Sequence, residues 1–183
     1  MDLLGIPLRL RVWLAAALLA LPALSAAQAD REVQVKAAFL YKFGDFVEWP
    51  ANAFAGPDGV FLIGVVGADA LAAELERVTA GRTIQERKVV VRRLQRGEAP
   101  SRLHLLFVGQ AEGARLAEIL AAVKGQALLV VTESENALEQ GSVINFVLVG
   151  DKLRFDVALP PAERARLKIS ARLLAVARKV VPS

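Results

Sequence analysis

Cysteine is absent from this chain of 183 residues, and His104 is its only histidine. Without thiols the protein can form no disulfide and carry out no thiol redox chemistry, so packing alone must stabilise it. Metal sites and histidine-assisted nucleophiles need imidazole or thiolate groups, which this chain hardly supplies. His104 lies in an apolar stretch and is interpreted as structural, and no Gly-x-Ser-x-Gly nucleophile motif occurs. We therefore expect a protein that is not an enzyme, with no catalytic residue, no metal and no cofactor.

A large excess of one charge is also missing. The whole chain carries 23 basic and 19 acidic residues. Residues 30–183 keep 21 and 18 of these, a net charge of about +3. This excess is too small to indicate a polyanionic partner, so we expect no nucleic acid to bind.

The N-terminus is hydrophobic, but its apolar run is short. Arg9 and Arg11 precede the run 13–21, Pro22 interrupts it, and small residues ending at Ala29 follow. The run falls short of the roughly 20 residues that cross a bilayer. A basic, then an apolar, then a small-residue region is typical of a secretory signal peptide. We predict that residues 1–29 are a cleaved signal peptide, which is favoured over a retained membrane anchor. Residues 30–183 are predicted to form a single exported domain.

Amphipathic segments and short apolar runs alternate along residues 30–183. Helical spacing predicts helices over 31–48, 70–80 and 112–123, the second capped by Asp69. A last helix is predicted to begin at Pro160 and to carry an apolar stripe made by Ile169, Leu173, Val176 and Val180. Apolar runs predict strands over 60–66, 88–94, 103–108, 127–132, 143–149 and 152–159. Residues 132–141 are predicted to be a polar, acidic loop.

The last two predicted strands are separated only by Gly150 and Asp151, which predicts a two-residue hairpin turn. In the second of them Lys152, Arg154 and Asp156 alternate with apolar residues, so one face is expected to be solvated. Strands that alternate with helices predict a parallel sheet covered on both faces. The predicted fold class is α/β: a three-layer α/β/α sandwich, with a mainly parallel six-stranded sheet, a C-terminal β-hairpin and a final helix.

Two polar segments are expected at the C-terminal ends of strands, the edge where open α/β sheets bind ligands. The segment 64–67, followed by Asp69, lacks the glycine pattern of dinucleotide or phosphate loops, so packing and capping explain it better. Glu133, Glu135 and Glu139 share one loop without a basic or nucleophilic partner, and a solvated loop is favoured over an acid–base pair. A small-ligand site near Gly67 and Glu133 remains the alternative to a protein-binding function.

Two further groups of side chains are candidates for protein contacts. The predicted last helix is strongly basic, through Arg164, Arg166, Lys168, Arg172, Arg178 and Lys179. Its basic side chains are interpreted as a solvated face, with contact to an acidic partner or to lipid headgroups as the alternative. Five aromatic residues, Phe39, Tyr41, Phe43, Phe46 and Trp49, fall within eleven residues, more than one narrow helix face can bury. The phenylalanines are interpreted as core, whereas Tyr41 and Trp49 are interface candidates.

Several separated motifs occur in a characteristic order. They are Lys36-Ala-Ala-Phe-Leu-Tyr-Lys-Phe43, Phe46-Val-Glu-Trp-Pro50, Gly81-Arg82, His104-Leu-Leu-Phe107, Gly141 with Ile144-Asn-Phe146, Leu153-Arg-Phe-Asp156, and Leu167-Lys-Ile-Ser170 with Leu173-Leu174. Through them the chain resembles the YfiR family of exported bacterial proteins over about residues 33–181.

This resemblance implies a periplasmic, non-catalytic regulator. Such a protein binds the periplasmic part of an inner-membrane diguanylate cyclase, a GGDEF protein, and holds it inactive, which controls cyclic-di-GMP and biofilm formation. Family members form dimers, so a homodimer is expected. Some members carry cysteines whose oxidation state matters, and this chain departs from them because it has none.

The predicted partner-binding residues are Tyr41, Trp49, Pro50, Asn145, Phe155, Lys168 and Arg172. Several of these have a structural role available as well. Trp49 and Pro50 suit a helix end, Asn145 suits backbone groups near the hairpin, Phe155 suits the core, and Arg172 suits an ion pair.

Overall fold

The computed structural model describes residues 28–54 and 59–183. The predicted signal peptide lies outside the described residues except for residues 28 and 29, which belong to a helix over residues 28–46. We call this element the N-terminal helix. Within the described part of the chain, no helix is long and apolar enough to span a membrane.

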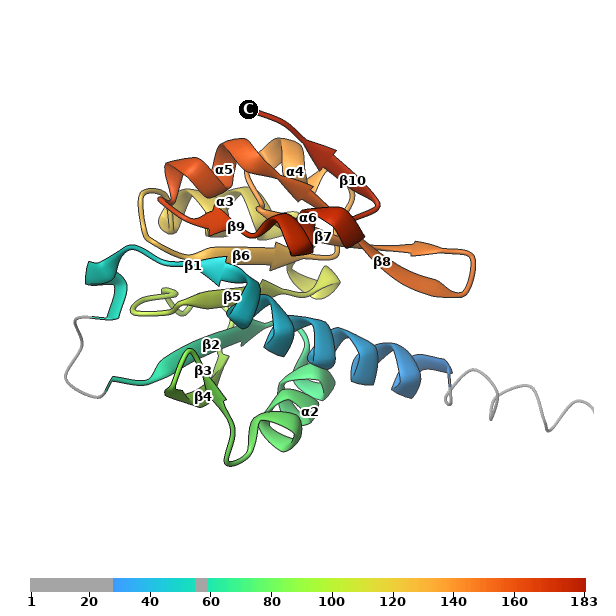
Figure 1. Cartoon of the computed structure of the whole chain (residues 1–183). Helices are drawn as coiled ribbons and strands as arrows, with labels where there is room; N and C mark the ends of the chain where they lie inside the picture. The colour runs from blue at the N-terminus through green and yellow to red at the C-terminus, as the bar shows by residue number, and fades with distance from the viewer. Residues whose placement is uncertain (1–27, 55–58) are drawn as a thin grey trace, which may run out of the picture.

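A mixed sheet of eight strands organises the described residues (Figure 1). Its order is β10 (Lys179–Val181), β8 (Lys152–Ala158), β7 (Ile144–Val149), β6 (Leu129–Thr132), β5 (Leu105–Val108), β2 (Phe61–Val66), β4 (Arg87–Leu94) and β3 (Thr83–Ile84). The central strands from β7 to β4 are parallel. Strand β8 is antiparallel to β7, β3 is antiparallel to β4, and β10 is parallel to β8.

Helices cover both faces of the sheet. Both faces are apolar, because successive apolar side chains of each strand point to opposite sides. Leu105 and Phe107 join one apolar cluster, whereas Leu106 and Val108 join the other. The first cluster also contains residues of the N-terminal helix and of α2 (Asp69–Thr79). The second contains residues of α3 (Leu116–Ala122), which continues from the 3-10 helix η3 (Gln110–Arg115). The prediction of an α/β fold is therefore confirmed.

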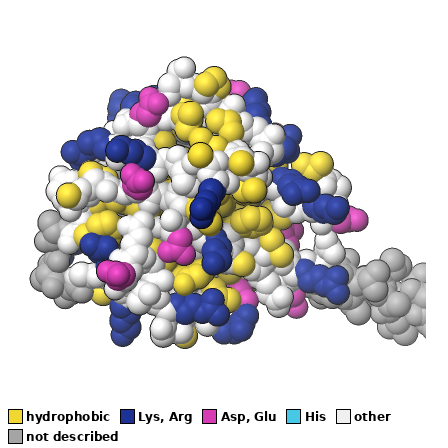
Figure 2. All heavy atoms as spheres, viewed as in Figure 1, with side chains coloured by type: hydrophobic (Ala, Val, Ile, Leu, Met, Phe, Trp, Pro, Cys, Tyr) yellow, Lys and Arg dark blue, Asp and Glu magenta, His cyan; other side chains and the backbone are white. Residues whose placement is uncertain are grey.

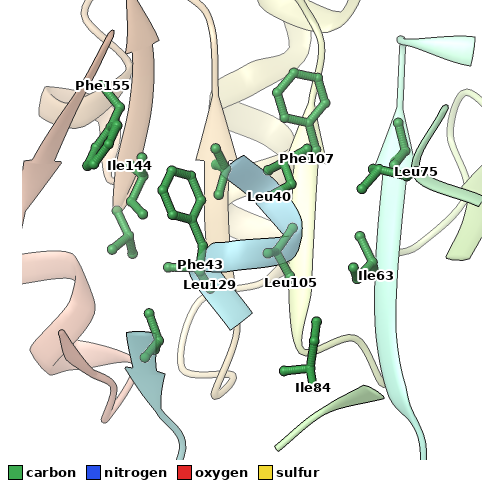
Figure 3. Close-up of a cluster of buried hydrophobic side chains, with 14 of the residues drawn as sticks. Leu40, Phe43, Ile63, Leu75, Ile84, Leu105, Phe107, Leu129, Ile144 and Phe155 are labelled. Carbon is green, nitrogen blue, oxygen red and sulfur yellow. The ribbon is translucent and has the colours of Figure 1, made fainter. Parts of the chain in front are cut away.

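The larger cluster is centred on the N-terminal helix, whose Leu40 and Phe43 point into it (Figure 3). The Phe43 ring lies 5.1 Å from Phe155 and 5.8 Å from Phe146. The neighbouring Phe39 ring lies 5.5 Å from Phe155. These edge-on and stacked contacts join the helix to strands β7 and β8, and each contributes about 0.5 to 1.5 kcal/mol beyond area burial.

The predicted hairpin is confirmed. Strands β7 and β8 pair from Ile144↔Val157 to Val149↔Lys152, so only Gly150 and Asp151 form the turn. Gly150 has a φ of 59°, a left-handed conformation that glycine adopts at low cost.

The prediction of a six-stranded sheet is wrong in strand number, because the mixed sheet has eight strands, although its central strands are parallel as predicted. Two strands were missed in the large sheet, β3 and β10, and both lie at its edges. The turn between β3 and β4 consists of Gln85 and Glu86, both at positive φ, and these residue types give little signal for such a turn. Gln85 is held in place because its side-chain nitrogen donates to the carbonyls of Gly44 and Val47 at 3.0 and 2.7 Å.

The predicted final helix is also wrong, because the chain beyond Pro160 breaks into four pieces. These are α5 (Leu159–Arg164), β9 (Lys168–Ile169), α6 (Ala171–Val176) and β10. Arg166 has a φ of 59°, which ends α5. Strand β9 then pairs antiparallel with β1 (Val47–Glu48), and Ser170 accepts a hydrogen bond from the Leu173 nitrogen to begin α6. Backbone pairing with β1 and β8 outweighs the helical pattern.

Three local predictions also need correction. The first predicted helix ends at residue 46, because residues 47 and 48 form β1. Asp69 makes no capping hydrogen bond and lies in the first turn of α2. The predicted loop over 132–141 contains the short helix α4 (Ala137–Gln140).

Asp156 does not lie on a solvated face of β8. It is 5% exposed, and both of its carboxylate oxygens accept hydrogen bonds from the Arg178 guanidinium. The distance from Arg178 Nε to Asp156 Oδ1 is 2.8 Å. Arg178 reaches Asp156 because β10 covers the outer edge of β8, an arrangement that the strand's alternation did not reveal.

Two loops meet closely where strands β2 and β5 end. An added Cβ on Gly109 would lie 2.3 Å from the carbonyl oxygen of Gly67, which itself has a φ of +69°. The Gly109 nitrogen also donates to the Val66 carbonyl at 2.9 Å. Only glycine fits at position 109 without moving the backbone.

Replacing Gly109 with alanine should lower the free energy of unfolding by about 1 to 3 kcal/mol, because the new methyl group presses on fixed backbone. Urea unfolding followed by circular dichroism measures the loss. Gly113→Ala is the matched control: its nearest neighbour would be Ser134 Oγ at 3.5 Å, so a change within about 0.5 kcal/mol is expected. Equal stabilities of the two variants would contradict the close approach of these loops.

Candidate binding surfaces

Trp49 anchors the segment that follows the N-terminal helix. Its indole nitrogen donates to the His104 carbonyl at 3.2 Å, and its ring meets Phe61 edge-on at 5.1 Å. Tyr41 is likewise tied to the scaffold, since its hydroxyl donates to the Thr83 carbonyl at 3.0 Å. Both side chains remain partly exposed. They therefore have structural contacts and still reach the surface.

His104 is held as a neutral ring by two backbone groups. Its Nδ1 accepts from the Leu62 nitrogen at 2.9 Å, which places the proton on Nε2, 3.1 Å from the Ala53 carbonyl. Burial lowers the pKa of His104 below its ordinary value. Phe54 stacks on the ring at 4.5 Å. This set of contacts supports the structural interpretation of His104.

Two sequence motifs that lie far apart along the chain meet through the β1–β9 pair (Figure 1). Glu48 is opposite Lys168, and the Ser170 nitrogen donates to the Phe46 carbonyl at 2.9 Å. Trp49 and Pro50 directly follow β1, and Arg172 lies two residues beyond Ser170 in α6. The structure therefore gathers four of the predicted partner-binding residues, Trp49, Pro50, Lys168 and Arg172, in one region.

The other three predicted partner-binding residues lie elsewhere. Phe155 is 2% exposed and packs in the core, and Asn145 is 8% exposed near the end of the parallel strands. Tyr41 faces the β3 side, where the Arg82 guanidinium lies 5.6 Å from its ring. Among the seven, only Lys168 and Arg172 are exposed; the others are half-buried or buried.

An exposed surface runs over the N-terminal helix and α6. We call it the helix–α6 surface and define it by its exposed residues: Val35, Ala38, Lys42, Lys168, Arg172 and Val176. Val35 and Val176 are 42% and 63% exposed. Figure 2 shows hydrophobic side chains gathered over the middle of this face with basic side chains among them. Apolar groups mixed with positive charge suit contact with an acidic protein surface.

A pocket of about 490 Å³ lies where the parallel strands end. We call it the strand-end pocket. It is lined by Glu32, Lys36, Gln110, Glu133, Ser134, Glu135, Asn145, Phe146, Val147, Leu148 and Leu153. The predicted ligand edge thus contains a pocket at Glu133, but Gly67 is not part of its lining. The segment η3 closes that side, since a Cβ on Gly67 would lie 2.8 Å from Glu112 Cγ.

Lys36 links the N-terminal helix to the strand-end pocket. Its Nζ forms ion pairs with both Glu32 and Glu133, and Glu133 also accepts from the Gln110 nitrogen at 2.9 Å. Burial by itself would lower the pKa of Lys36, but hydrogen bonds and the charges of Glu133 and Glu32 raise it above its ordinary value. Glu133 is therefore an ion-paired carboxylate and not a free loop carboxylate, and no local pattern in the sequence reveals its distant partner Lys36.

The three glutamates of the predicted acidic loop do not all lie together. Glu133 and Glu135 line the pocket, whereas Glu139 lies exposed on α4. Across residues 28–54 and 59–183, no group of three or more histidine, cysteine, aspartate or glutamate side chains is placed to hold a metal ion.

The fold and these two surfaces define a mixed α/β protein with features suited to binding. The family described as YfiR/HmsC-like matches residues 33–178 of the chain. The chain therefore belongs to the YfiR/HmsC-like family, and the resemblance inferred from the motifs is confirmed.

The comparisons with other known proteins bear on the fold and not on the function. No curated protein matches the chain, while 11 chains of solved structures do. A conserved domain protein from Vibrio cholerae O1 biovar El Tor is similar with a TM-score of 0.52 and 13% identity, over 66% of this chain and 55% of that one. The ABC domain of a Streptococcus pneumoniae protein, in complex with L-Trp, has a TM-score of 0.49 and 12% identity, over 71% and 58% of the two chains. The chain thus spans little more than half the length of these structures.

The single histidine gives a direct test of the His104 environment. Its ring signals should titrate with a midpoint below 6.5, the ordinary value, in pH-dependent NMR spectra of the folded protein. Because the unfolded chain then binds the proton more readily, this residue's contribution to stability is full above pH 6.5 and is lost as pH falls through the folded pKa. A midpoint at or above 6.5 would show that the ring is not buried as described.

Proposed function

We propose that this protein is an exported, non-catalytic regulator that binds the periplasmic part of an inner-membrane diguanylate cyclase. Binding holds the cyclase inactive, and release raises cyclic-di-GMP and favours biofilm formation. The observation that carries the proposal is membership of the YfiR/HmsC-like family over residues 33–178. The N-terminal sequence, with its basic, apolar and small-residue regions, supports the periplasmic location.

The helix–α6 surface is the proposed contact with the cyclase. Lys168, Arg172, Val176 and Val35 are all exposed, and Val176 lies one helical turn from Arg172 in α6. An interface of this composition combines desolvation of apolar groups at its centre with charge recognition at its rim. Trp49 directly follows β1 and is anchored to His104 and Phe61, so changes at Trp49 would disturb folding as well as contact.

Cellular cyclic-di-GMP tests the proposal. Deleting the gene should raise the cyclic-di-GMP level, and complementation with the full chain should restore it. A version lacking residues 2–29 should fail, because it stays on the wrong side of the membrane. An unchanged level on deletion would overturn the proposed regulation, and rescue by the version without residues 2–29 would overturn the periplasmic location.

The same strain separates the contact surface from the rest of the molecule. The double variant Lys168→Glu, Arg172→Glu should leave cyclic-di-GMP high, since reversing two rim charges weakens the complex by about tenfold or more. Lys124→Glu is the matched control, because Lys124 is exposed at the end of α3, beside the other apolar cluster. The control should complement fully. Equal complementation by both variants would exclude this surface as the contact.

A further inference from the structure

The strand-end pocket contains more negative than positive charge. Three carboxylates line it, those of Glu32, Glu133 and Glu135, against the single ammonium group of Lys36. Lys36 is shared between Glu32 and Glu133, so those three groups together retain one negative charge. Glu135 is exposed at the pocket edge and adds a second. A positive charge on a ligand in this pocket therefore strengthens its binding, and a negative charge weakens it.

Polar groups at the pocket also lack protein partners. Asn145 is 8% exposed, and its side-chain oxygen accepts from Thr132 Oγ1 at 2.6 Å. Within the described residues its amide nitrogen makes no hydrogen bond, although Asn145 lines the pocket. The hydroxyl of Ser134 is buried and has no hydrogen-bond partner in the same part of the chain. Buried polar groups are normally satisfied, so the unpartnered Ser134 hydroxyl is unusual, whereas the Asn145 amide nitrogen is open to the pocket and available to a ligand.

The Thr132 contact determines which way the Asn145 amide points. Thr132 Oγ1 is also 3.0 Å from Ser142 Oγ and accepts the proton of the Ser142 hydroxyl, so the single Thr132 proton is free for the Asn145 oxygen at 2.6 Å. The Thr132 proton is then used on the Asn145 oxygen, which leaves the Asn145 nitrogen as the group available to the pocket. This nitrogen requires an oxygen acceptor on the ligand.

The remaining wall is apolar and comes from the β7–β8 hairpin. Phe146, Val147, Leu148 and Leu153 line the pocket there, and Leu148 is 57% exposed. A volume of about 490 Å³ is within the range of small-molecule sites, which combine apolar walls with a few placed polar groups.

We propose that the strand-end pocket binds a small organic cation: a protonated amine attached to an apolar body that also carries a neutral oxygen. The ammonium group lies between Glu133 and Glu135, the oxygen accepts from the Asn145 amide, and the apolar body covers Leu148 and Leu153. The site is separate from the proposed cyclase contact, and its occupation does not depend on that proposal. It does contact the same N-terminal helix through Glu32 and Lys36.

Matched probe compounds test the charge. Titration calorimetry of the purified protein should show saturable binding of 2-amino-1-phenylethanol, which has the amine, the hydroxyl and an apolar ring. Mandelate has the same ring and hydroxyl but a carboxylate, and it should not bind. 2-Phenylethylamine, which lacks the hydroxyl, should bind more weakly, because Asn145 then stays unpaired. Absence of amine binding, or equal binding of mandelate, would overturn the proposal.

A protein variant locates the site without disturbing the core. Glu135→Gln should weaken binding of 2-amino-1-phenylethanol by about two- to fivefold, the usual effect of one exposed ion pair. Glu139→Gln is the matched control, since Glu139 is exposed on the neighbouring α4 and does not line the pocket. Its affinity should equal that of the unmodified protein. Equal affinities of the two variants would place the bound amine outside this pocket.

Discussion

The structure depends on one packing contact, that of the N-terminal helix against the sheet. Leu40 and Phe43 are fully buried, and the Phe43 ring meets Phe155 and Phe146 from the β7–β8 hairpin. The protein has no cysteine and therefore no disulfide. The link between the N-terminal helix and the C-terminal strands must therefore come from packing, and this aromatic contact provides it. It also positions both candidate surfaces, since the same helix presents Val35 and Lys42 outward and Lys36 to the strand-end pocket.

A second constraint acts at the chain's C-terminal part. Strand β9 pairs with β1, and β10 pairs with β8. For this reason the chain after Pro160 forms two short helices and two short strands instead of one long helix. The Arg178–Asp156 pair secures β10 at the outer edge. Since Asp156 is almost fully buried, the pair fixes where β10 lies more than it stabilises the fold. The basic residues of this region are thereby divided between Arg178, which pairs with the buried Asp156, and Lys168 and Arg172, which are exposed.

The elements predicted correctly from the sequence are those whose local pattern agrees with the tertiary structure. The β7–β8 hairpin follows directly from alternation around Gly150, and the apolar runs of the central parallel strands need no distant partner to be recognised. The predictions failed where a contact with a distant segment determines the local structure. Gln85 and Glu86 adopt positive φ in a turn that the Gln85 side chain holds by hydrogen bonds to the end of the N-terminal helix. Residues 168–169 form a strand only because β1 is adjacent. The same applies to function. The family motifs name surface and core residues alike, and only the fold separates Lys168 and Arg172 from the buried Phe155.

We propose that the protein acts by contact through the helix–α6 surface, on the periplasmic side of a membrane cyclase. Inside-out membrane vesicles that contain the cyclase test this directly, because the catalytic part faces the buffer and the periplasmic part faces the vesicle interior. We predict that synthesis of cyclic-di-GMP from GTP falls when the protein is enclosed in the vesicles and is unaffected when the protein is added outside. Undiminished synthesis with the enclosed protein, or inhibition from outside alone, would contradict it.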